Sequence, residues 1–262
     1  MIQLIKYPRT PHIEGSRFQL GDHDLDSVPF EQIKGRHIVV EEKLDGANSA
    51  LRFNSAGKLY LQSRGHFLRG GVREKHFDLF KRWARTMAPV LWPVLTNRYV
   101  LYGEWLYAKH TIYYDRLPHF FMEFDLLDLD TGRFLDTPNR RQLLQGLPLT
   151  SVPVLDSGTA VSLNQVTRLL GRSQFKGDRW HENLTTEVAA RGLKVDLALR
   201  ETDPSNEMEG LYIKVEEEGH VIERFKFVRA SFLTVVHDSN SHWQSRPIIP
   251  NRLADGIDLF RG

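Results

Sequence analysis

The chain has 262 residues, 35 Lys and Arg against 33 Asp and Glu, no Cys, and 41% hydrophobic residues. This composition excludes a disordered chain, and the absence of Cys excludes a disulfide scaffold, a thiolate metal site and a cysteine nucleophile. The formal net charge of +2 gives no sign of a polyanionic partner. Because no signal peptide or membrane span is recognisable, we expect an intracellular, cytoplasmic protein.

The predicted elements alternate between strands and helices along the chain. Strands are expected over 37–43, 49–54 and 58–62, and a turn at 54–57 joins the last two. Helical spacing of apolar residues predicts a helix over 75–91, and strands follow at 98–106 and 120–127. Helices are expected to begin near Thr137 and near Ser162, and a further helix is expected over 187–200. A hairpin of two strands, 210–215 and 221–228, follows. This order favours an α+β fold built on antiparallel sheets with flanking helices.

Positive charge gathers in one segment despite the nearly neutral total. From Ser63 to Arg85 there are seven basic residues, including Arg64, Arg69 and Arg73, against two acidic ones. Such a segment attracts phosphates, or it forms the solvated face of a helix. The sequence leaves both interpretations open.

The most informative peptide surrounds Lys43, in the run Glu-Glu-Lys-Leu-Asp-Gly-Ala-Asn. Lys43 closes one predicted strand, Asp45 and Gly46 form a turn, and a second strand follows. A lysine held at a strand end becomes a nucleophile when its surroundings favour the neutral amine. The alternative is a surface lysine beside an ordinary Asp-Gly turn.

Lys43-Leu44-Asp45-Gly46 resembles the first motif of the covalent nucleotidyltransferases, the superfamily of polynucleotide ligases and messenger-RNA capping enzymes. The other motifs of that superfamily follow in their expected order. They are Ser63–Gly65, Tyr102–Trp105, Phe121–Leu127, Glu209–Lys214 and Arg224–Val228.

The resemblance assigns roles to single residues. It makes Lys43 the residue that carries the nucleotide, and it implies an adenylation-type nucleotidyltransferase fold. Arg64 would contact nucleic acid or the nucleotide sugar, and Phe124 would stack on the purine. Glu104 would contact the ribose and a metal, and Glu209 would supply a second carboxylate to the nucleotide site and its metal. Contact with phosphate is the implied role of Lys214, Arg224 and Lys226. Gly46 belongs to the nucleotide-binding turn, and Arg69 and Arg73 are expected to contact the polynucleotide.

Asn48 and Glu42 indicate the branch of the superfamily. Asn48, five positions after Lys43, and Glu42, which would recognise the adenine, resemble the RNA ligases that seal nicks in duplex RNA. Asp45 departs from that pattern, and so does Arg224, which stands where a lysine is usual. Since Arg does not lose its proton, Lys226 is the expected lysine of tunable pKa.

The implied activity is ATP-dependent joining of a 3′-hydroxyl to a 5′-phosphate, through a lysyl-AMP and an adenylylated 5′-phosphate. The expected cofactors are ATP and Mg²⁺ or Mn²⁺, and the surrounding cations are expected to lower the pKa of Lys43. The expected partner is RNA, or an RNA/DNA duplex, with a nick or splinted ends. The sequence leaves open whether a separate end-processing kinase or phosphatase prepares the ends, and the protein is expected to be a monomer. The alternatives are a capping-type guanylyltransferase that uses GTP and a catalytically silent nucleic-acid-binding module.

The chain divides into an adenylation domain over 1–228 and a short tail over 229–262. The 34 residues after Val228 are fewer than the roughly 41 that an OB-fold needs. The tail contains His237, His242, Trp243, Arg246 and Arg252, which either contact a polynucleotide or pack on the core.

Overall fold

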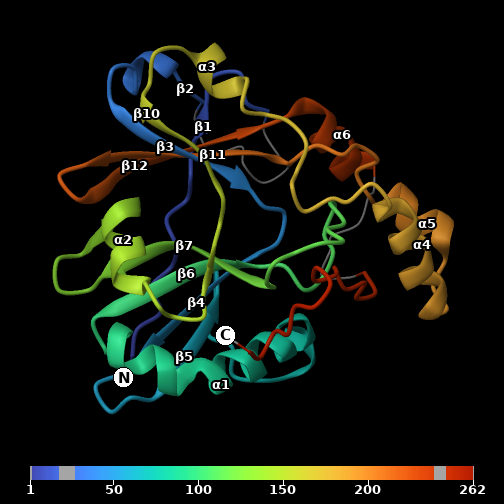
Figure 1. Cartoon of the computed structure of the whole chain (residues 1–262), viewed down its shortest axis with the longest axis horizontal. Helices are drawn as coiled ribbons and strands as arrows, with labels where there is room; N and C mark the ends of the chain where they lie inside the picture. Colours follow the sequence, from blue (N-terminus) through green and yellow to red (C-terminus); the bar gives the residue numbers. More distant parts are fainter. Residues whose placement is uncertain (1, 18–26, 239–245, 262) are drawn as a thin grey trace.

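The computed structural model describes residues 2–17, 27–238 and 246–261, and its strands form one sheet (Figure 1). The strand order is β10-β3-β11-β12-β8-β7-β6-β4-β5, and every neighbouring pair along this path is antiparallel. The bounds are β10 Val154–Thr159, β3 His37–Lys43, β11 Gly210–Glu217, β12 His220–Val228, β8 Arg133–Leu135, β7 Phe121–Asp128, β6 Tyr99–Trp105, β4 Ala47–Phe53 and β5 Leu59–Ser63. The prediction of a mixed fold with a large antiparallel sheet is confirmed.

Short elements complete the described chain. Strands β1 (His12–Ile13) and β2 (Ser27–Val28) add parallel pairs beside β12, and β9 (Thr150–Ser151) pairs with β7. The helices are η1 Phe30–Gln32, η2 Val72–Phe77, α1 Asp78–Leu95, α2 Thr137–Leu144, α3 Leu163–Thr167, α4 Trp180–Ala190, α5 Val195–Arg200 and α6 Ala230–Asp238. Each of the described helices is too short or too polar to cross a lipid bilayer.

The sheet bends so that two halves face each other (Figure 1). Strands β3, β11 and β12 lie in the upper half of the view, and β4 to β7 lie in the lower half, above α1. The short strand β8 pairs with both β12 and β7 and so joins the halves. The N-terminal segment, drawn in dark blue, passes between them.

Most predicted elements are present, with two differences in the helices. The helix expected over 75–91 consists of η2 followed by α1, which continues through Pro89 and Pro93 to Leu95. The single helix expected over 187–200 is wrong, because α4 ends at Ala190 and α5 begins at Val195. Gly192 lies between them at φ 66°, a left-handed conformation that interrupts a helix and that glycine adopts readily.

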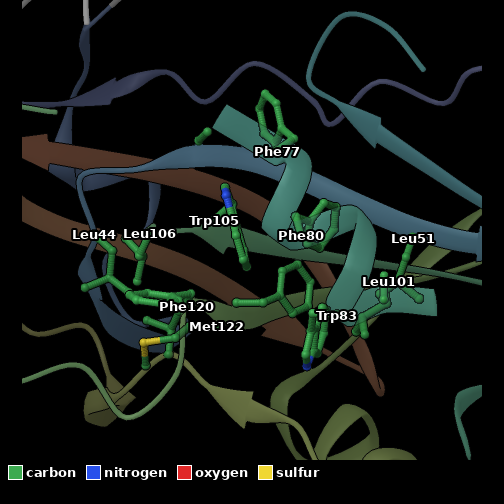
Figure 2. Packing of buried hydrophobic residues seen from close by; sticks show 14 of the residues in the cluster. Leu44, Leu51, Phe77, Phe80, Trp83, Leu101, Trp105, Leu106, Phe120 and Met122 are labelled. Atoms are coloured by element: carbon green, nitrogen blue, oxygen red, sulfur yellow. The ribbon is translucent and has the colours of Figure 1, made fainter. Parts of the chain in front are cut away.

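The main hydrophobic core lies between α1 and the lower half of the sheet (Figure 2). Phe80 and Trp83 of α1 are fully buried, and the ring of Phe80 lies 5.1 Å from that of Trp105 and 5.3 Å from that of Phe121. The Trp105 indole donates to the His76 carbonyl at 2.9 Å. This packing fixes β6 and β7, which carry two of the predicted motifs.

Candidate active site

The strand pairing of the upper half places Lys43 beside Glu209. Lys43 ends β3 and pairs with Gly210, the first residue of β11. Glu209 therefore precedes the position opposite the lysine, and Lys43 Nζ lies 2.7 Å from Glu209 Oε1. The Lys43 side chain is 24% exposed whereas that of Glu209 is 2% exposed. A partly accessible amine thus faces a buried carboxylate.

The turn after Lys43 is held by the loop that follows β6. Asp45 Oδ2 accepts hydrogen bonds from the backbone N–H groups of Thr111 and Ile112 at 2.7 and 2.6 Å, and the Asp45 N–H donates to the Tyr114 hydroxyl at 2.9 Å. A Cβ on Gly46 would lie 2.8 Å from the Trp105 carbonyl oxygen. The turn is therefore fixed by buried hydrogen bonds and admits only glycine at 46.

The same loop is tied to the C-terminal segment. The buried side chain of Asn251 accepts from the Tyr114 N–H at 2.9 Å and donates to the Leu106 carbonyl at 2.7 Å. Asn251 thereby fixes the residue whose hydroxyl receives the Asp45 N–H. The sequence pattern did not indicate Asn251, Tyr114 or Thr111, because none belongs to a recognised motif.

Three carboxylates determine the electrostatics around the amine. Burial alone would lower the pKa of Lys43, but Glu209, Glu104 and Asp45 outweigh it and raise that pKa above its ordinary value. The protein's own charges therefore raise the pKa of Lys43 and do not lower it as expected, because the nearest of them are carboxylates rather than cations. Burial raises the pKa of Glu104 to about 8 and that of Glu209 to about 7, against the opposing effect of Lys43.

Asn48, Arg64 and Lys226 lie around this centre. Asn48 of β4 pairs with Glu104 of β6, so their side chains share one face of the sheet. The positive charge of Arg64 opposes the rise in the pKa of Glu104. The positive charge of Lys226 opposes the rise in the pKa of Glu209. The structure thus brings residues of five separate motifs to one place.

Two carboxylates of the centre fit a divalent cation. Glu209 Oε2 is buried and has no hydrogen-bond partner among the described residues, and Glu209 is close enough to Glu104 for its charge to raise the pKa of Glu104. No group of three or more potential His, Asp or Glu ligands is present in the described part of the chain. One or two carboxylates suit Mg²⁺, which usually keeps several waters.

Glu42 points away from this centre, because side chains alternate along β3. It is 1% exposed, and its Oε1 accepts from the Ser173 hydroxyl at 2.5 Å. Burial raises the pKa of Glu42 to about 7, although the Ser173 hydrogen bond acts in the opposite direction.

A family model described as RNA ligase matches residues 36–228, which is most of the chain. The chain belongs to the RNA ligase family. Its structure is similar to that of a Naegleria gruberi RNA ligase variant with ATP and Mn, with TM-score 0.53, 18% identity, and coverage of 80% of this chain and 54% of that one. Another variant with AMP and Mn has TM-score 0.53 and 19% identity at the same coverage.

These likenesses establish a shared fold. The chain spans about half the length of the solved structures that it matches. No curated protein matches the chain's sequence.

The family motif residues Lys214 and Arg224 lie in a buried ion network rather than free beside Lys43. Lys214 Nζ lies 2.9 Å from Glu41 Oε2 and 3.1 Å from Asp125 Oδ1, and Arg224 Nε lies 2.9 Å from Asp125 Oδ2. Although burial alone would raise it, Arg224 and Lys214 hold the pKa of Asp125 well below its ordinary value. Direct contact of either cation with phosphate stays a prediction.

Tyr7 of the N-terminal segment contacts the same buried ion network through its hydroxyl. Its hydroxyl donates to Asp125 and lies 2.7 Å from the Tyr212 hydroxyl, and its ring lies 5.2 Å from that of Phe124 in an edge contact. Phe124 is therefore already packed on an aromatic neighbour. Stacking of a purine on Phe124 stays a prediction.

The remaining predicted residues lie at the surface or in the tail. Arg64 and Arg69 are exposed, whereas the side chain of Arg73 lies outside the described residues, as do His242, Trp243 and the His237 side chain. Arg246 pairs with Glu201. Phe232, Leu233 and Leu259 join the main core. The described part of the tail therefore packs on the core.

Proposed function

We propose that this chain is an ATP-dependent RNA ligase with a nucleotidyltransferase fold, which joins a 3′-hydroxyl to a 5′-phosphate through covalent lysyl-AMP. The observation that carries the proposal is the convergence of Lys43, Glu104 and Glu209 in a chain of the RNA ligase family. These residues come from β3, β6 and the start of β11, and their motifs are collinear with those of ligases.

In the first step, Lys43 Nζ attacks the α-phosphorus of ATP. A phosphorus–nitrogen bond forms, the bond to the bridging oxygen breaks, and pyrophosphate leaves. The amine must be neutral to attack, so its proton passes to solvent and its 2.7 Å ion pair with Glu209 Oε1 is given up before the new bond forms. Lys226 is the cation proposed to hold the α-phosphate.

In the second step, AMP passes from Lys43 to a 5′-phosphate of the polynucleotide. In the third, a 3′-hydroxyl attacks that activated phosphate, and AMP leaves. Each step places extra negative charge on phosphoryl oxygens, so cations aimed at those oxygens lower the barrier. Arg64, exposed at the turn after β5, is the proposed contact with the substrate strand.

Glu104 and Glu209 are the residues proposed to hold Mg²⁺ or Mn²⁺. When bound, the ion supplies positive charge that neutralises the carboxylates and stabilises the phosphoryl oxygens. Loss of that negative charge removes the reason for the raised pKa of Lys43. Before the ion binds, the carboxylates therefore keep the Lys43 amine protonated. Neutralisation of the carboxylates by the ion then favours the neutral, nucleophilic amine.

Covalent labelling tests this proposal directly. Incubation with α-labelled ATP and Mg²⁺ is expected to label the protein, and Lys43→Ala is expected to abolish the label. The matched control is Lys34→Ala, because Lys34 is exposed and pairs only with Glu31 at the surface. Labelling that persists in Lys43→Ala contradicts the proposal, and preferential labelling by GTP identifies a guanylyltransferase instead.

The substrate is proposed to be RNA at a nick or at splinted ends. A panel of nicked duplexes that varies RNA and DNA on each side of the nick, and in the template, measures this preference. Failure of every RNA junction in a protein that self-labels would contradict the substrate class and leave the lysyl-AMP step standing.

A further inference from the structure

The chain turns back sharply after β5 and forms the outer edge of the lower half-sheet. The Ser63 N–H donates to the His66 carbonyl at 3.0 Å, the Leu68 N–H donates to the Leu61 carbonyl at 2.8 Å, and Phe67 bridges to Gln62. The returning segment thus lies along the edge of β5 and is joined to it by one isolated bridge. Arg64 lies at the tip of the turn.

A buried ion pair holds this edge segment in place. Glu74 accepts the backbone N–H groups of Arg69 at 3.1 Å and Gly70 at 2.7 Å, and Lys81 Nζ lies 3.3 Å from Glu74 Oε2. The Glu74 and Lys81 side chains are only about a tenth exposed. The segment is therefore fixed by the protein interior rather than free to move away.

Two rings and two cations gather on this edge. The ring centroids of Tyr60 and Phe67 lie 6.0 Å apart at 61°. Lys58 Nζ lies 5.6 Å from the Tyr60 ring centroid, and the Arg69 guanidinium lies 5.8 Å from that of Phe67. Lys58 and Arg69 are exposed, and Tyr60 and Phe67 are half-buried. We call these four residues the edge platform.

The edge platform shares the face of the sheet that carries the active-site residue Asn48. Tyr60 pairs with Arg52, and Arg52 lies four residues after Asn48 on β4, so all three side chains project to one face. Four residues along a strand and one strand across correspond to about 14 Å between Asn48 and Tyr60. That distance is a few nucleotides of an extended strand.

The local charge favours a polyanion. From Gly46 to Arg73 the sequence contains no Asp or Glu and five Lys or Arg. The next acid, Glu74, is buried against Lys81. The edge platform therefore presents positive charge and aromatic surface together, which is the combination that single-stranded nucleic acid recognises.

We propose that the edge platform binds an unpaired base of the RNA strand a few nucleotides from the active site. Tyr60 and Phe67 supply stacking surface, and Lys58 and Arg69 contact the flanking phosphates. A base within a duplex has both faces covered, so the rings recognise an unstacked nucleotide. This inference rests on the proposed ligase function, and it narrows the substrate to a strand that is unpaired a few nucleotides from the ends that are joined.

Binding to a short, fluorescently labelled single-stranded RNA, followed by anisotropy over a series of salt concentrations, tests the edge platform. Tyr60→Ala and Phe67→Ala are expected to weaken binding by about fivefold or more, with the dependence of log K on log salt unchanged. Lys58→Ala and Arg69→Ala are expected to reduce that slope by about 0.7 each, because each removes one phosphate contact. On the fully paired duplex of the same sequence, Tyr60→Ala and Phe67→Ala are expected to bind as the unsubstituted protein does.

Conservative and distant variants serve as controls. Tyr60→Phe and Phe67→Tyr keep the rings and are expected to retain affinity. Phe260→Ala removes an exposed ring beside α1 and is expected to change nothing. Unchanged binding by Tyr60→Ala and Phe67→Ala, or an equal loss on the duplex, overturns the edge platform.

Self-labelling with ATP, which needs no RNA, is measured in parallel on the unsubstituted protein. Absence of that label overturns the proposed ligase function, whereas the RNA titrations still decide whether the edge platform stacks on a base. The two failures are therefore distinguishable.

Discussion

Replacing Glu42 with Gln should change how stability depends on pH. Glu42 is 1% exposed, and burial raises the pKa of its carboxyl from 4.5 to about 7. Between those values the folded protein binds more protons at this group than the unfolded chain does, so the free energy of unfolding falls as pH rises. A shift of this size corresponds to about 3 kcal/mol, lost progressively between about pH 4.5 and pH 7. Gln does not titrate and removes this contribution.

Urea denaturation of both proteins at intervals from about pH 5 to pH 8 measures the difference. The unfolding free energy of Glu42→Gln minus that of the unsubstituted protein is expected to increase by up to about 3 kcal/mol as pH rises. Ser173→Ala is the matched control, since its hydroxyl donates to Glu42 and opposes the raised pKa. In that variant the midpoint of the pH dependence should move upward. A difference that does not vary with pH would refute the assignment of a buried, protonated Glu42.

Two further predictions concern the turn after Lys43, the proposed nucleophile. Gly46→Ala should abolish most ATP labelling, because the added Cβ meets a backbone oxygen at 2.8 Å, whereas Gly158→Ala has nothing within 4 Å and should label normally. Labelling of Gly46→Ala at the normal rate would contradict the close packing described. Asn251→Ala should lower the free energy of unfolding by about 2 to 4 kcal/mol, because it leaves the buried Tyr114 N–H and a carbonyl without partners. The exposed Asn97→Ala should change it little, and equal denaturation midpoints for both variants would disprove the role of Asn251.

Local sequence signals predicted most of the fold because they act over a few residues. Alternation and turn residues predicted the hairpin of β11 and β12, and the Ser162 side chain caps α3 by accepting the Gln165 N–H. The helix over 187–200 was wrong because apolar spacing continues across Gly192, and only the backbone conformation there shows the interruption.

Part of the candidate active site was likewise predictable from the sequence, and part was not. Lys43, Glu104 and Glu209 were identified from motif residues in the expected order, and strand pairing brings them together. The sign of the pKa shift of Lys43 was not predictable, because it depends on which charges end nearest to the amine. Sequence motifs identify the cationic and carboxylate residues but do not give the distances between them.

The sequence by itself indicated the turn after Lys43, the order of the strands along the chain and the family. Only the tertiary structure decided that Lys214 and Arg224 are committed to Glu41 and Asp125, and that Tyr7 closes their network. These partners lie roughly a hundred residues or more apart in the chain. No local period encodes such contacts, because they arise when the bent sheet brings its two halves face to face and buried charges must find partners there.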